Sequence, residues 1–97
     1  MSLAHHLPPQ PAAPTINLNG SDGQELFEAN RKLVHALDAA VEAMLPTAPH
    51  ARDYLGHREE FARAREEHWQ RVSLLRDMIH DLDVLGFLIK KQLEKEF

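Results

Sequence analysis

The C-terminal part of the chain, from about His57 to Phe97, contains no proline and a single glycine, Gly86. After Phe61 its seam residues recur at alternating steps of three and four, the heptad spacing of helices that pack along their length. The pattern predicts one long coiled-coil-like helix over about residues 58–96. Its contact seam is expected to be Phe61, Arg65, His68, Val72, Leu75, Ile79, Leu82, Gly86, Ile89 and Leu93.

A second apolar stripe precedes this segment and ends at Pro46. It consists of Leu26, Asn30, Leu33, Leu37, Ala40 and Met44, flanked by Phe27, Val34, Val41 and Leu45. The helical spacing predicts a helix over about residues 24–45, because proline disfavours helix in the residue before it. Residues 46–57, with Pro46 and Pro49, form the predicted loop.

The first 20 residues contain no Asp, Glu, Lys or Arg, and four prolines fall between positions 8 and 14. Such a segment is expected to be an extended arm, since proline is incompatible with a helix interior. Thr15 to Leu18 alternates polar and apolar residues, which is typical of a short strand. Whether the arm lies on its own chain or on a second copy is left open by the sequence.

The unequal helix lengths predict a partner. At 1.5 Å per residue the first helix spans about 33 Å and the second about 60 Å. In an antiparallel hairpin with a short loop, the first helix would cover the second only as far as about Ile79. The apolar residues beyond it would then need a second copy, so the expected oligomer interface is Leu82, Leu85, Gly86, Leu88, Ile89 and Leu93.

The sequence therefore predicts an all-α fold: an antiparallel two-helix hairpin over residues 21–97, with an extended N-terminal arm over residues 1–20. Dimerisation about a two-fold axis would complete it as a four-helix bundle. The alternative is a bend at Gly86 that folds the end of the second helix back as a third, short helix. Gly86 is unfavourable within a helix, and a close helix approach at a dimer axis would be one sufficient reason for it.

Composition excludes several classes of function. The 97 residues suffice for one domain, 43% are apolar, and 15 acidic residues against 11 basic ones argue against a nucleic-acid partner. The absence of cysteine excludes disulfides and thiolate sites and agrees with a cytoplasmic protein. No apolar run approaches the ~20 residues that cross a membrane, and the first residues lack the features of a signal peptide.

Candidate chemistry is sparse. No nucleophile–base pair and no glycine-rich phosphate loop is present, so no catalytic residue, cofactor or metal is predicted and the chain is not expected to be an enzyme. Asp77 and His80 lie three residues apart on one helix face, as in half of a bundle metal motif, but no second such motif exists. His68 lies on the seam and is expected to be hydrogen-bonded and partly buried. The loop offers one candidate polar surface: His50, Arg52, Asp53 and His57.

Three short motifs carry a resemblance to a known group of proteins. They are Thr15 to Gly20 before the first helix, Pro49 to Tyr54 in the loop, and Ala64 to His68 with Arg71 in the second helix. Over residues 15–76 the chain resembles small uncharacterised helical proteins encoded by tailed phages and prophages. Ala51 stands where the group has glycine, and Leu55 where it has a second tyrosine. The resemblance implies a helical hairpin of phage or prophage origin, without an activity.

These observations favour a non-enzymatic structural or interaction protein that associates with itself. The first alternative is an adaptor or regulator that binds a different protein through the apolar C-terminal half of the second helix. The second alternative is a metal-binding helical bundle.

Overall fold

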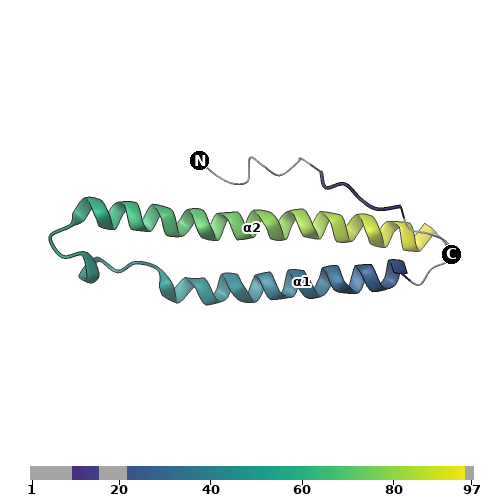
Figure 1. Ribbon diagram of the computed structural model, residues 1–97, viewed down its shortest axis with the longest axis horizontal. Coiled ribbons are helices and arrows are strands. Elements are labelled where there is room, and N and C mark those ends of the chain that lie inside the picture. Colours follow the sequence, from purple (N-terminus) through teal and green to yellow (C-terminus); the bar gives the residue numbers. More distant parts are fainter. Residues whose placement is uncertain (1–9, 16–21, 96–97) are drawn as a thin grey trace.

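The computed structural model describes residues 10–15 and 22–95. Two helices dominate it: α1 (Asp22–Met44) and α2 (Arg58–Lys95), joined through two short 3₁₀ turns, η2 (Leu45–Thr47) and η3 (Ala51–Tyr54). Figure 1 shows α1 and α2 side by side and antiparallel. The predicted all-α, two-helix architecture is confirmed, and no strand occurs among these residues.

The ends of the helices follow local chemistry. α1 stops just before Pro46, and the Thr47 hydroxyl donates to the Met44 carbonyl at 2.6 Å, satisfying one of its free C-terminal acceptors. α2 begins after Gly56, whose positive φ of 80° is easily reached only by glycine. Helix α2 then continues through Gly86 to Lys95, so the alternative of a third helix folded back at Gly86 is wrong.

The register of the hairpin differs from the expected one. Asn30 and Arg31 of α1 lie beside Leu82 and Asp83 of α2, so α1 covers the C-terminal part of α2. Residues 45–57 extend beside the first turns of α2 instead of forming a tight loop (Figure 1). The ring of Tyr54 lies 5.7 Å from that of Phe61. The expectation that α1 stops at about Ile79 and leaves the end of α2 uncovered is therefore wrong.

The core is a single seam between the two helices. On α2 the fully buried seam residues are His68, Val72, Gly86 and Ile89, all members of the predicted seam. On α1 the buried positions are Gly23, Asn30, Val34 and Val41, whereas Leu26 and Leu33 of the predicted stripe are exposed. The stripe of α1 that packs on α2 thus keeps Asn30 and turns toward Val34 and Val41, which the prediction had placed at the flank.

The described part of the N-terminal arm lies beside the last turns of α2 (Figure 1). Gln92 Nε2 donates to the Pro14 carbonyl at 2.6 Å, and Pro11 is buried. Residues 10–15 are extended and rest on their own chain. The strand expected over residues 15–18 lies, from residue 16 onward, outside the described residues.

Candidate interaction surface

A largely exposed apolar stripe runs along α1 on one flank of the seam. Its six members alternate at three- and four-residue steps, the same heptad spacing as the seam. Five are exposed and Ala40 is half-buried. The stripe consists of Leu26, Ala29, Leu33, Ala36, Ala40 and Ala43.

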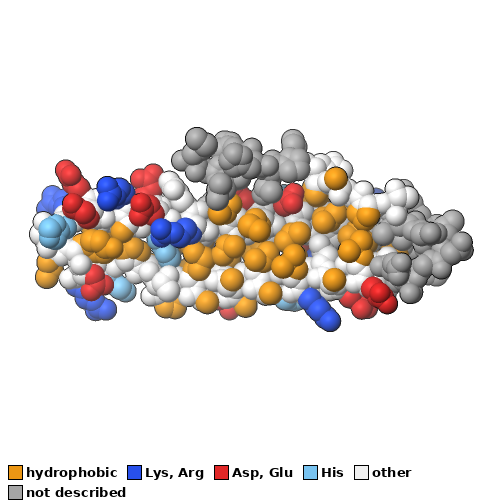
Figure 2. Space-filling view, viewed as in Figure 1, with side chains coloured by type: hydrophobic (Ala, Val, Ile, Leu, Met, Phe, Trp, Pro, Cys, Tyr) orange, Lys and Arg blue, Asp and Glu red, His pale blue; other side chains and the backbone are white. Residues whose placement is uncertain are grey.

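A matching stripe lies on α2: Leu74, Met78, Asp81, Leu85 and Leu88. The Arg31–Asp83 ion pair marks the opposite flank of the seam, so in an antiparallel pair the two stripes share one side of the hairpin. Figure 2 views a face on which hydrophobic side chains gather over both helices. We call the two stripes together the apolar face. The smallest extent of the hairpin is 13 Å, so within residues 22–95 no further layer of helix covers this face.

Charged residues border the apolar face rather than divide it. Glu25 and Lys32 lie one residue before Leu26 and Leu33, on the outer edge of α1. Asp81 is the one charged member of the face. It is half-buried, and within residues 10–15 and 22–95 no ion pair to it is formed.

The register of the hairpin is fixed by one polar contact in the seam. Asn30 is 7% exposed, and its Nδ2 donates to the Leu82 carbonyl at 2.9 Å. A Cβ at Gly86 would overlap Asn30 Oδ1 and lie 3.1 Å from its Cγ, so the side chain occupies space that only glycine leaves open. Asn30 Oδ1 is itself buried without a hydrogen-bond partner in the described structure. Gly86 thus serves a close approach inside one chain, not at a dimer axis.

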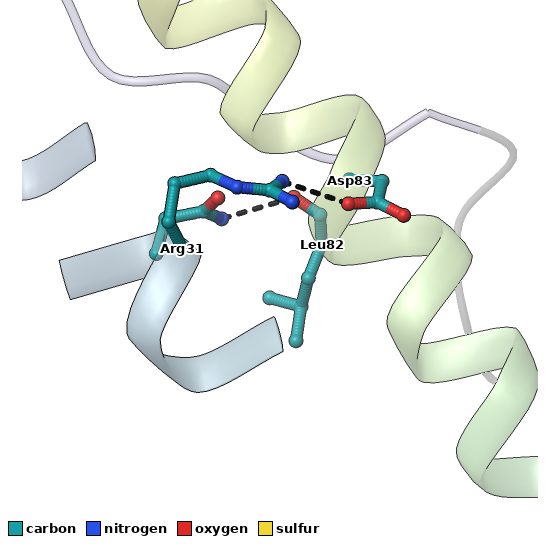
Figure 3. Close-up of polar contacts among 4 residues, drawn as sticks. Arg31, Leu82 and Asp83 are labelled. Carbon is teal, nitrogen blue, oxygen red and sulfur yellow. Dashed lines mark hydrogen bonds and ion pairs between the residues drawn. The ribbon is translucent and has the colours of Figure 1, made fainter. Parts of the chain in front are cut away.

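An ion pair lies directly beside this contact, at the surface. Arg31 Nη1 donates to Asp83 Oδ1 at 2.8 Å, and both side chains are partly exposed (Figure 3). Exposed ion pairs contribute little to stability, so the buried amide contact determines the register and the ion pair agrees with it.

This register places the six residues of the expected oligomer interface in two different environments, the seam and the apolar face. Gly86 and Ile89 are buried against α1, and Ile89 is only 1% exposed, so they leave almost no surface for a partner. Leu82 and Leu93 are half-buried members of the same seam. Only Leu85 and Leu88 lie on the apolar face. The Leu26–Ala43 stripe is absent from the predicted interface, although its three- and four-residue spacing is visible in the sequence.

The candidate polar surface at the turn is exposed, but its side chains are not brought into a site. His50, Arg52, Asp53 and His57 are all exposed, and the turn is held by backbone bonds, including Asp53 N–H to the His50 carbonyl at 3.0 Å. Arg52 and Asp53 form no ion pair with each other. Beside this polar surface lies an open groove of about 530 Å³, which is lined by Ala51, Tyr54, Leu55, Gly56, Arg58 and Phe61.

His68 is buried more deeply than expected. Its side chain is 3% exposed on the seam, its ring packs edge-on against Trp69 at 5.2 Å, and its Nε2 has no hydrogen-bond partner among the described residues. The expectation of a hydrogen-bonded, partly buried imidazole therefore fails for this nitrogen. Asp77 is half-buried and His80 exposed, and within the described ranges no three His, Asp or Glu side chains are grouped closely enough to hold a metal ion.

Comparisons with known proteins add no relative. No protein-family model, no curated protein and no solved structure matches the chain. Neither α1 nor α2, over the residues described, has the length and hydropathy needed to cross a membrane. The apolar face therefore stands as the candidate functional surface on its geometry alone.

Proposed function

We propose that this chain is a non-enzymatic structural or interaction protein that associates with itself through the apolar face. The observation that carries the proposal is a continuous, uncovered apolar stripe at heptad spacing on α1, matched by one on the same side of α2. Burying a Leu or Met side chain contributes ~1.5–3 kcal/mol, so covering several of them supplies free energy comparable with the stability of a whole domain. Two hairpins packed face to face would form a four-helix bundle with one shared core.

The test is the mass of the folded protein in solution. Light scattering during size-exclusion chromatography at micromolar concentration is expected to give twice the 11.1 kDa of one chain. A helical, cooperatively unfolding monomer under these conditions would overturn the proposal.

An adaptor that binds a different protein is the second candidate, because a partner helix can cover the same leucines. It predicts a monomer whose apolar face remains accessible, detected as binding of a fluorescent hydrophobic dye. Leu85 and Leu88 on the C-terminal half of α2 belong to both candidates.

The proposal extends to origin and location. The Pro49 to Tyr54 motif supports a phage or prophage origin, and the absence of cysteine supports a cytoplasmic location. The genes that flank the coding sequence test the first, and cell fractionation tests the second.

A further inference from the structure

The apolar face restricts how a second copy can dock on it. Two hairpins that meet face to face have two simple two-fold arrangements. With the axis parallel to the helices, each α1 lies on the α2 of the second copy. With the axis perpendicular to the helices, α1 lies on α1 and α2 on α2. This inference rests on the proposed self-association and asks which arrangement the residues favour.

Side-chain size favours the parallel axis. The Asn30–Gly86 contact defines which residues of α1 and α2 lie at the same height along the hairpin. Rotation about an axis parallel to the helices leaves these heights unchanged, so the same residues face each other between copies. Extending each helix at about 1.5 Å per residue places Ala29 opposite Leu88 of the second copy and Ala43 opposite Leu74 of the second copy. Ala40 comes opposite Met78 of the second copy. Each of these alanines on α1 therefore meets a large side chain, which lets the two surfaces interdigitate.

Charge separates the two arrangements more sharply. With the parallel axis, Lys32 lies within about one helical turn of Asp81 of the second copy. With the perpendicular axis centred on the α1 stripe, the two Asp81 carboxylates meet near the axis. Half-buried like charges repel strongly because water screens them poorly.

The area is sufficient for a dimer. The α1 stripe from Leu26 to Ala43 is about 26 Å long, and two helices side by side are roughly 20 Å wide, which gives about 500 Å² in projection. The accessible area of a corrugated helix surface exceeds its projection, which brings it toward the ~800 Å² per partner of a standard interface.

We infer that the second copy docks on the apolar face about an axis parallel to the helices, with each α1 against the α2 of its partner. Asp81, the one charged member of the face, then finds its counter-ion in Lys32 of the other chain. The result is a four-helix bundle in which every neighbouring pair of helices is antiparallel.

Cysteine cross-linking tests the arrangement, because the chain has no cysteine of its own. Ala40→Cys and Met78→Cys are made in separate chains that carry tags of different size, mixed, and oxidised. The expected product is a disulfide-linked heterodimer containing up to half of the chains, the share that random exchange allows, with little linkage in either variant alone. His35→Cys with His80→Cys is the matched control, since both histidines are exposed, nearly level and on the opposite face.

The outcomes separate this inference from the proposed function. A dimer by light scattering in which Asp81→Cys alone cross-links efficiently, while the Ala40→Cys and Met78→Cys mixture does not, overturns the parallel axis but leaves self-association standing. A dimer in which the His35→Cys and His80→Cys mixture cross-links instead overturns the use of this face. A monomer overturns both.

Discussion

The side chain of Asn30 occupies the space that any residue larger than glycine would need at position 86. The two residues are far apart in sequence, yet their contact accounts both for a glycine inside a helix and for a polar amide inside the core. Glycine costs about 1 kcal/mol relative to alanine in a helix, and a buried amide costs free energy unless it is hydrogen-bonded. Together they form one contact, in which Asn30 reaches the Leu82 carbonyl across the gap.

Gly86→Ala is therefore expected to destabilise the protein, against the helix propensity of alanine. The new Cβ forces Asn30 to turn away from Leu82 or strains the seam, either of which costs about 1–3 kcal/mol. Urea unfolding at fixed protein concentration should show a lower midpoint. In an Asn30→Ala background the overlap is absent, so the same Gly86→Ala change should raise the free energy of unfolding by about 1 kcal/mol. An equal effect in both backgrounds would contradict the contact.

His68→Leu is expected to stabilise the protein. The substitution removes a buried nitrogen that lacks a partner within residues 10–15 and 22–95 and replaces it with an apolar side chain on an apolar seam. A gain of about 1 kcal/mol or more in the free energy of unfolding should follow, measured by urea denaturation. His80→Leu, at an exposed position of the same helix, is the control and should change stability by less than about 0.5 kcal/mol. A loss of stability in His68→Leu would contradict the inference that this nitrogen is buried without a partner.

The seam of α2 was predictable from spacing because most of its positions before Gly86 have at least one polar neighbour in the sequence. The face of α1 that packs on α2 was not predictable in this way. Two apolar stripes run along α1 one residue apart, as in the pairs Leu26 with Phe27 and Leu33 with Val34. Spacing cannot decide which stripe faces α2. The fit of Asn30 against Gly86 decides it, and this is a tertiary contact that no local pattern encodes.

The register escaped prediction for a related reason. Helix lengths fix how much of α2 is covered but not which part, because residues 45–57 span the first turns of α2 before α1 begins to pack. Most of the expected oligomer interface therefore lies in the seam of one chain. Leu26 and Leu33, which the sequence pattern assigned to the core stripe of the first helix, are exposed instead.

The Arg31–Asp83 ion pair is expected to contribute little. A double-mutant cycle with Arg31→Ala and Asp83→Ala should give a coupling free energy below about 1 kcal/mol, because both side chains are well exposed, at 38% and 47%. The coupling should weaken further in 0.5 M salt, at which the Debye length is roughly 4 Å. A larger, salt-independent coupling would mean that the pair becomes buried between copies.

Charge exchange across the dimer should identify the partner of Asp81. Lys32→Glu places a carboxylate near Asp81 of the second copy twice in each dimer, so the dissociation constant is expected to rise about tenfold. Combining Asp81→Lys with Lys32→Glu should return the dissociation constant to its original value, because the two charges attract each other again with their signs reversed. Sedimentation equilibrium measures both. Failure of the double variant to recover would argue against this pairing.

Two exposed apolar residues on opposite sides of the hairpin offer the clearest test of the face. Leu33 is 47% exposed on the apolar face, and Phe87 is 58% exposed on the other side of α2. Leu33→Arg puts a charge in the middle of the proposed interface, where it would be desolvated without a partner, so the dimer should dissociate to monomers at micromolar concentration. Phe87→Arg introduces the same charge at an equally exposed apolar position and should leave the mass unchanged. Far-ultraviolet circular dichroism should show that both variants remain helical. If Phe87→Arg separates the copies and Leu33→Arg does not, the interface lies on the other side of the hairpin.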